Sequence, residues 1–419
     1  LSHYSDIYPN GKVTGYFGPL TEAAVKKFQK KHNIPTTGIV GPKTQAKIQE
    51  LSNASRTIVA SIPGFSARVT SGLTLSPKCE KAGSLSNSPL SLEHLSYIIP
   101  MGQMFGDHVT PTDHQYWVSP EGYLANKNYE VVAPANGTIV SIQRMSQTDP
   151  QTNDFRIVMD LACQRSVIFI HLKDLASKLT NALGTSENIS THIPVEAGDV
   201  IGHSNGIFDF SVVDNAVTLP GFVYPEHYQD EPWKIHTVDP FEYFTDSMRS
   251  QLVAKSLRQV DPVGGKIDYD DNGKLLGNWF LNGTQYRDSS NYQDYFRNHL
   301  SVAYHHIDPQ QIIISTGNYQ GQSKQFALLS NVPKPETITP SSGIIKYELA
   351  EPILYRTSTN QPWDQKTFAN DIVVKPSSNL SGTVLLQLID NQHLLAEFFP
   401  KKSASEVSDF TGAAELYQR

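Results

Sequence analysis

The chain has 419 residues, of which 39% are hydrophobic and 18% are charged, so it can bury about three domain cores of roughly 150 residues each. Its net charge of −7 and pI of about 6.1 argue against nucleic acid as a partner, because binding to a phosphate backbone needs clustered Lys and Arg. No run of about 18 or more apolar residues occurs, so we expect no membrane-spanning helix.

Residues 1–52 contain two similar predicted helix starts, a Gly-Pro-x-Thr turn at 18–21 and another at 41–44. In each turn the Thr is expected to be the N-cap that accepts a hydrogen bond from the first helical amides. Ala24, Val25 and Phe28 fall on one face of the first predicted helix. This pattern indicates a small helical bundle.

Over residues 16–35 and 37–48, this stretch is similar to the small helical peptidoglycan-binding repeat found in many cell-wall enzymes. The resemblance implies that residues 1–52 bind peptidoglycan or another surface glycan. That repeat carries one more helix in front, and residues 1–5 resemble its end, so the chain is expected to begin inside the domain. A helical spacer that has lost binding is the alternative.

Residues 53–89 are rich in Ser, Gly and Pro and are predicted to form an extended linker, with one strand at 66–75. The linker holds Cys79, and Cys163 is the other cysteine of the chain. A sparse, even count fits one disulfide in an exported protein, and it fits two unrelated buried thiols equally well.

Residues 90–260 are predicted to form a β domain. Apolar alternation over 131–142, broken by a Pro and an Asn-Gly turn, indicates a half-buried hairpin. Residues 155–160 and 166–172 are rich in β-formers and predict a second strand pair, and residues 195–206 add a strand and turn marked by Gly.

In their order, these motifs resemble the core of the lysostaphin-type zinc endopeptidases, which cut peptidoglycan cross-bridges, over roughly residues 100–216. The resemblance implies a zinc ion held by a His and an Asp from one loop and by a His from a later His-x-His pair. Such a site keeps one position open for the water that attacks the substrate.

His108 and Asp113 match the first ligand pair, although their spacing is one residue longer than the family's. His171 matches the His that lies beside the metal, and would be catalytic only in an active enzyme. Phe208 and Phe210 stand where the His-x-His pair is expected, while Asp209 would face the opposite side of its strand. We therefore expect no cofactor; zinc, with Asp209 as a ligand, belongs only to the alternative of an active enzyme.

An aromatic cluster at 222–244 and an amphipathic helix at 246–257 end this domain. The cluster suits either a glycan-stacking platform or internal packing.

Residues 261–419 read as strands at 275–280, 300–304, 311–315, 344–349 and 383–389, which predict a β-sandwich or barrel. Residues 268–273 (DYDDNG) match the start of a calcium loop, but the final acidic ligand is replaced by Trp279, so a hairpin turn is expected. His305 and His306 are adjacent at a strand end, where they are predicted to face opposite ways.

The sequence thus predicts a multidomain chain, α and then mainly β. We expect an exported bacterial protein of the cell wall, cell surface or periplasm that binds peptidoglycan or another surface glycan as a binding or scaffolding protein. Its endopeptidase-like domain is expected to be inactive. An active zinc endopeptidase with an altered ligand set and a subunit of a cell-surface assembly are the alternatives, and a homo-oligomer is compatible with each.

Overall fold

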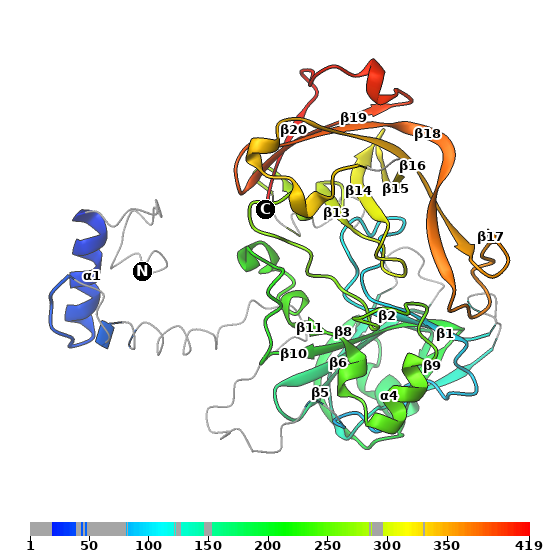
Figure 1. Cartoon of the computed structure of the whole chain (residues 1–419). Helices are drawn as coiled ribbons and strands as arrows, with labels where there is room; N and C mark the ends of the chain where they lie inside the picture. The colour runs from blue at the N-terminus through cyan, green and yellow to red at the C-terminus, as the bar shows by residue number, and fades with distance from the viewer. Residues whose placement is uncertain are drawn as a thin grey trace. The chain divides into compact units, whose positions relative to one another are not determined.

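The computed structural model describes residues 19–38, 43–44, 47, 81, 83–120, 122, 127–145, 153–284, 286, 296–329 and 332–419. The chain divides into two compact units, residues 1–61 with 66–73 and residues 62–65 with 74–419. A helix characterises the first unit and antiparallel strands dominate the second, so the chain is α and then mainly β as predicted (Figure 1). Across the described ranges, no helix combines the length and the apolar character needed to cross a membrane.

The first unit contains helix α1 (Pro19–Lys31). Ala24, Val25 and Phe28 are at most 2% exposed, which confirms the predicted apolar face. The predicted N-cap is wrong, because the helix already begins at Pro19, two residues before Thr21. Pro is favoured at the first helical position, where no intrahelical partner exists for a backbone N–H.

Eight strands of the second unit form one antiparallel sheet in the order β1-β2-β10-β6-β5-β4-β8, with β11 paired to β10. Their bounds are β1 (Tyr97–Ile99), β2 (Gln115–Val118), β4 (Gly137–Arg144), β5 (Phe155–Leu161), β6 (Arg165–Leu172), β8 (Asn188–Val195), β10 (Ile207–Asp214) and β11 (Thr237–Val238). The predicted strand pair at 155–160 and 166–172 is confirmed as β5 and β6. A three-stranded sheet of β3 (Tyr129–Val132), β9 (Val200–Ser204) and β7 (Asp174–Leu175) lies beside it.

The hairpin predicted over residues 131–142 is wrong, because β3 pairs with β9 whereas β4 pairs with β5 and β8. The backbone N–H groups after β3 bond elsewhere: Val132 N donates to Pro89 O and Ala133 N to Asp199 O, both at 2.9 Å. Pro134 has no N–H to continue a ladder. The chain therefore leaves one sheet at this point and enters the other.

Short helices connect the strands of this half: α3 (Ser177–Leu183), η2 (Pro225–Tyr228), η3 (Lys234–His236), η4 (Pro240–Tyr243) and α4 (Asp246–Val253). The predicted helix at 246–257 is α4, whose first turn is capped by the Thr245 hydroxyl. Most rings of the aromatic cluster, among them Tyr228, Phe241 and Phe244, are at most 2% exposed. These rings pack internally, so they are not a glycan platform.

The C-terminal part is a closed antiparallel barrel, which settles the choice between sandwich and barrel. Its strands run in the order β15-β14-β13-β12-β20-β19-β18-β16, and a further pairing of β15 with β16 closes the ring. Trp279, Phe326 and Tyr347 fill the interior and are fully buried. The bounds are β12 (Gly277–Leu281), β13 (His299–Tyr304), β14 (Ile312–Tyr319), β15 (Gln322–Leu328), β16 (Ile345–Arg356), β18 (Ile372–Leu388), β19 (His393–Pro400) and β20 (Glu415–Gln418), with η6 (Pro335–Thr337), η7 (Pro340–Ser342) and η8 (Ala404–Glu406) between them.

Strands β16 and β18 continue beyond the barrel as a long hairpin that carries β17 (Gln361–Pro362) near its end (Figure 1). We call this extension, residues 352–376, the arm. Its Trp363 is 8% exposed and packs against Tyr97 of β1 with ring centroids 5.8 Å apart. The Tyr97 hydroxyl donates to Gln365 O at 2.8 Å. The arm thus fastens the barrel to the eight-stranded sheet.

Two smaller expectations for the C-terminal part are wrong. The turn at 271–273 does not join two strands, because β12 follows it but residues 266–270, directly before it, form no strand. The rings of His305 and His306 do not face opposite ways; their centroids are 4.2 Å apart and both side chains are buried. Strand β13 already ends at Tyr304, so strand alternation does not apply to them.

Cys163 lies in the turn between β5 and β6 and is disulfide-bonded. The described residues include no free cysteine. Cys79, the other cysteine of the sequence, lies outside the described residues, as do most of the predicted linker and its strand at 66–75.

Candidate functional site

Strand β10 decides which residues face the site. Phe208 and Phe210 are fully buried on one face, where they pack against Trp117 and Phe169. Asp209 lies between them in sequence, so its side chain is on the other face. The site-facing position on this strand is therefore 209, and the interpretation that Phe208 and Phe210 replace metal ligands is wrong, because both rings belong to the core.

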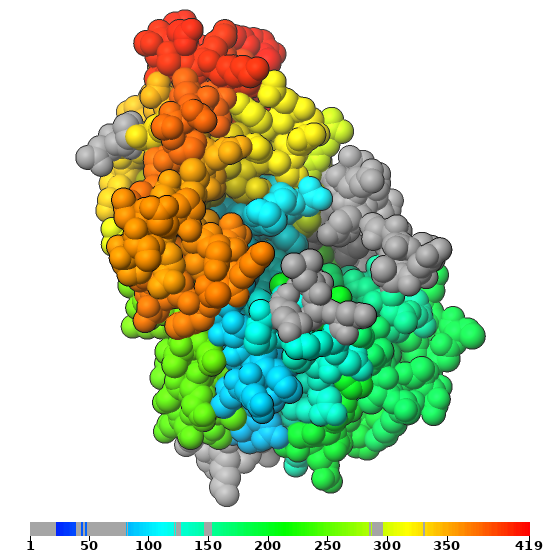
Figure 2. Space-filling model, turned by 90° about the vertical axis from the view of Figure 1, so that its right-hand side faces the viewer, coloured from blue at the N-terminus to red at the C-terminus, as the bar shows by residue number. Residues whose placement is uncertain are grey.

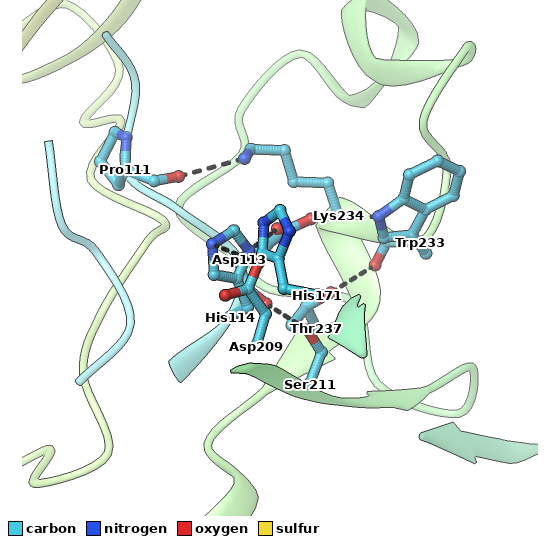
Figure 3. Close-up of polar contacts among 9 residues, drawn as sticks. All are labelled: Pro111, Asp113, His114, His171, Asp209, Ser211, Trp233, Lys234 and Thr237. Carbon is cyan, nitrogen blue, oxygen red and sulfur yellow. Dashed lines mark hydrogen bonds and ion pairs between the residues drawn. The ribbon is translucent and has the colours of Figure 1, made fainter. Parts of the chain in front are cut away.

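The Asp209 carboxylate meets two imidazoles that come from different elements (Figure 3). Its Oδ2 atom lies 3.4 Å from Nε2 of His114, directly before β2, and 3.5 Å from Nε2 of His171 in β6. Both β2 and β6 pair with β10, so the sheet itself brings the three side chains together. Asp209 is 3% and His114 is 7% exposed, which makes this a mostly buried ionic cluster.

A second carboxylate orients each imidazole. Asp113 Oδ1 lies 3.2 Å from Nδ1 of His114, and Asp154 Oδ2 lies 3.0 Å from Nδ1 of His171. Trp233 Nε1 donates to Asp113 Oδ2 at 3.0 Å, so both oxygens of Asp113 have partners. The contacts form one continuous chain, from Asp113 through His114, Asp209 and His171 to Asp154.

His171 owes its position to a β-bulge. The register of β5 against β6 shifts between Phe155 and Ile157, which leaves an extra residue in β6. His171 itself has φ +67, in the left-handed region that costs a side-chain-bearing residue conformational energy. Bulges turn side chains away from strand alternation, and here the bulge aims the imidazole at Asp209.

The charges of the cluster are coupled. Burial favours the neutral form of His171, but the hydrogen bond to Asp154 and the charge of Asp209 outweigh it and raise the pKa to about 9. Burial raises the pKa of Asp209, and the two imidazoles oppose that shift. The His171 side chain remains 43% exposed, so solvent screens part of its ion pairing.

A buried lysine borders the cluster. Lys234 is 2% exposed, and its Nζ donates to Pro111 O at 3.1 Å and lies 4.9 Å from the centre of the Tyr286 ring. Burial disfavours ionisation of Asp113, yet the charge of Lys234 and the contacts with His114 and Trp233 hold the pKa of Asp113 below its usual value. Asp113 is thus a charged residue that fixes His114.

His108 occupies a separate place. Its ring packs edge-on against His114, at a centroid distance of 5.8 Å, and against Phe296 at 5.4 Å. Burial lowers its pKa to about 3, with the nearby His114 and Lys234 acting in the same direction. His108 is therefore an uncharged neighbour of the cluster at neutral pH.

Of the predicted site residues, His171 and Asp209 are in contact with each other. Asp113 contacts the Nδ1 atom of His114, and the ring of His108 packs edge-on against the ring of His114. The sequence reasoning missed His114. A signal for it was present, because Trp117 reads as a core residue and strand alternation then puts 114 and 116 on the face opposite the core. In the pairing of β2 with β10, Tyr116 stands across from Asp209.

Comparison with known families agrees with the first resemblance. Residues 1–48 match the family model described as a putative peptidoglycan binding domain, which supports association with the cell wall. An "uncharacterized protein in bpoA1 3'region" of Kitasatospora aureofaciens is 48% identical over 52 residues, which are 12% of this chain and 44% of that protein. The chain thus spans less than half of that relative.

Two solved structures are similar to parts of the chain. A structure of the SpoIIQ–SpoIIIAH pore-forming complex aligns with 32% of this chain and 87% of its own, at 13% identity and a TM-score of 0.24. The solution structure of lysostaphin aligns with 70% of this chain and all of its own, at 11% identity and a TM-score of 0.23.

Proposed function

We propose that this chain is an exported bacterial cell-wall protein that binds peptidoglycan through its N-terminal unit and carries an endopeptidase-like β domain that binds rather than cleaves. The match of residues 1–48 to a peptidoglycan-binding family supports the first part. The disulfide at Cys163 supports export, because disulfides persist in oxidising compartments outside the cytosol.

The geometry at Asp209 supports the second part. A zinc ion needs deprotonated imidazole nitrogens and an open centre between its ligands. Here one Asp209 oxygen is within 3.5 Å of both Nε2 atoms, so the three side chains contact one another and leave no open centre between them. In the described part of the chain, no group of three or more His, Cys, Asp or Glu side chains is arranged to hold a metal ion. This arrangement supports the proposal of a site without catalytic zinc.

The first test concerns the wall contact. Full-length protein should co-sediment with purified peptidoglycan sacculi, and added salt should weaken this only modestly because a helical surface, rather than net charge, would make the contact. A chain that starts at Asn53 is the matched comparison. Equal pelleting of both chains would show that the wall contact lies elsewhere.

The second test concerns chemistry. After metal-free purification and addition of zinc, the protein should hold clearly less than one equivalent and should release no new amino groups from cross-linked peptidoglycan. Asp209→His, which offers an imidazole at the site-facing position, is the comparison that should bind zinc more tightly. One equivalent of tightly held zinc in the natural chain, with cleavage abolished by His108→Ala or His114→Ala, would instead establish an endopeptidase.

A further inference from the structure

The loop between β1 and β2 folds into a small hairpin before it reaches the site. Gly102 N donates to Thr112 O at 2.9 Å, and at the tip His108 N donates to Phe105 O at 3.0 Å. Phe105 and His108 also form an isolated β-bridge. We call residues 102–112 the 102–112 hairpin; it ends directly before Asp113, the first residue of the ionic cluster.

The C-terminal barrel holds the tip of this hairpin through polar contacts with β15. Ser323 Oγ donates to Asp107 Oδ1 at 3.1 Å, and Gln325 Nε2 donates to Gly106 O at 3.0 Å. Positions 323 and 325 lie on the outer face of β15, since the alternate residue Phe326 fills the barrel core.

Apolar packing completes the attachment. Met104 is 8% exposed and packs on the outside of the barrel against Ala303, Ile313 and Ala327. Two of these three are alanines, which leave room for the Met104 side chain beside the strands. Figure 2 shows the cyan stretch of chain that includes this region lying against the yellow strands of the barrel.

Phe105 stands between these attachments and yet faces solvent. Its side chain is 71% exposed, the highest value among the large hydrophobic residues exposed in the described ranges, which are otherwise Val200, Val260 and Ile389. A single exposed apolar residue is ordinary on a protein surface. This ring differs because the residues on both sides of it are fixed to the barrel, and because three residues later His108 packs against His114 of the ionic cluster.

We propose that Phe105 is the stacking platform of a sugar-binding subsite at the edge of the site formed by His114, His171 and Asp209. The identity of the sugar, an N-acetylated pyranose of the wall glycan, rests on the proposed function. A backbone that is held in place before binding loses little conformational entropy when a ligand stacks on the ring it carries. The barrel is then the element that presents the platform.

The surroundings favour a sugar over an apolar peptide side chain. A pyranose has an apolar face for the phenyl ring and hydroxyl groups at its edge for nearby polar groups. The Asp107 carboxylate, of which Oδ1 accepts from Ser323, is such a group beside Phe105. An apolar side chain needs enclosure by several apolar neighbours, whereas the Phe105 side chain is 71% exposed.

Hydroxyl-radical footprinting of the full-length protein tests the subsite directly, with triacetylchitotriose as the probe. Labelling of Phe105 should fall in proportion to the fraction of protein bound, whereas labelling of Ile389, which is 51% exposed on the barrel, should not change. Unchanged labelling of Phe105 at saturating trisaccharide would overturn the proposal. Because labelling is read residue by residue, binding to the N-terminal unit does not interfere.

Variants give a second readout. Phe105→Ala should weaken trisaccharide binding at this subsite roughly tenfold, as expected for loss of an anchoring aromatic residue, while Phe105→Trp should retain it. Ile389→Ala is the matched control and should bind as the natural protein does. Protection by a wall-derived peptide without sugar, in place of the trisaccharide, would assign the platform to peptide and contradict the sugar.

The two proposals fail separately. Failure of the full-length protein to pellet with sacculi, with intact protection of Phe105 by the trisaccharide, would contradict the role of the N-terminal unit alone. Intact sacculus binding with no protection of Phe105 would contradict the subsite alone.

Discussion

At the scale of single residues, His171 combines a strained backbone with an imidazole held between two carboxylates. A positive φ is disfavoured in a residue that carries a side chain. The imidazole that it positions contacts Asp154 and Asp209 at the more exposed end of the ionic cluster. The bulge in β6 is therefore a feature of the site.

The first prediction concerns the protonation of His171. Its imidazole should titrate with a pKa of about 9, because Asp154 and Asp209 stabilise the charged form. Titration of the ring proton shifts by NMR measures this value. Asp154→Asn and Asp209→Asn should each lower it, and a midpoint at or below 6.5 in the natural protein would contradict the charge coupling.

The same shift has a consequence for stability. Since the pKa of folded His171 lies above the ordinary value of 6.5, its ion pairs stabilise the fold fully below pH 6.5, and that contribution is lost as the pH rises through about 9. The difference in urea midpoint between the natural protein and His171→Gln should shrink over that interval. A difference that grows with pH would have the wrong sign.

The candidate site could be predicted only in part from the sequence. His171 and Asp209 were identified because each sits in a recognisable strand motif. His114 was missed because the expected ligand spacing drew attention to Asp113 and His108, whereas the facing of each side chain is set by the register of β2 on β10. Register depends on pairing between distant segments, which a single sequence does not state.

At the scale of elements, β10 separates a core face from a site face, and substitutions can test that division. Phe208→His or Phe210→His should cost about 3 kcal/mol or more, because each leaves a cavity and buries a polar ring. Ile207→His should be tolerated better, since position 207 is only partly buried and packs at the margin of a smaller cluster, away from Phe208 and Phe210. Urea unfolding of the three variants measures this; equal stability of Phe210→His and Ile207→His would contradict the assigned faces.

Strand existence was predictable from alternation and β-forming residues, as for β5, β6 and most barrel strands. Which strands pair with each other was less predictable. Residues 131–142 read as a hairpin, yet β3 ends at Val132, two residues before Pro134, and β4 lies in another sheet. A hairpin and two consecutive strands in different sheets have the same local sequence pattern. What distinguishes them here is that the backbone N–H groups of Val132 and Ala133 donate to carbonyls far away in the sequence.

At the scale of the whole molecule, the arm joins two hydrophobic cores that the sequence presents as separate domains. Trp363 and Tyr97, which make this contact, are 266 positions apart in the sequence. Such a contact leaves no local mark in the sequence, since the arm reads simply as the continuation of two strands. The barrel was predictable as a class, but its attachment was not.

A further prediction tests this attachment. Trp363→Ala should destabilise the protein by about 3 kcal/mol, the usual cost of truncating a buried aromatic residue, and should separate the unfolding of the two cores. Differential scanning calorimetry should then show two transitions where the natural β unit shows one. Thr359→Ala, an exposed change on the same arm, is the control. A single, merely shifted transition would contradict the coupling.

The closure of the C-terminal barrel by β15 and β16 also bears on how slowly its amides exchange with solvent. A sheet with free edges can fray strand by strand, but in a closed ring each strand has a neighbour on both sides. Without a free edge strand, local opening cannot begin by detaching one strand from the sheet. Central amides such as those of Ile314 and Val384 should therefore exchange with deuterium only when the whole barrel unfolds. Rapid exchange at these amides relative to the edge strand β8 would show that the ring opens locally.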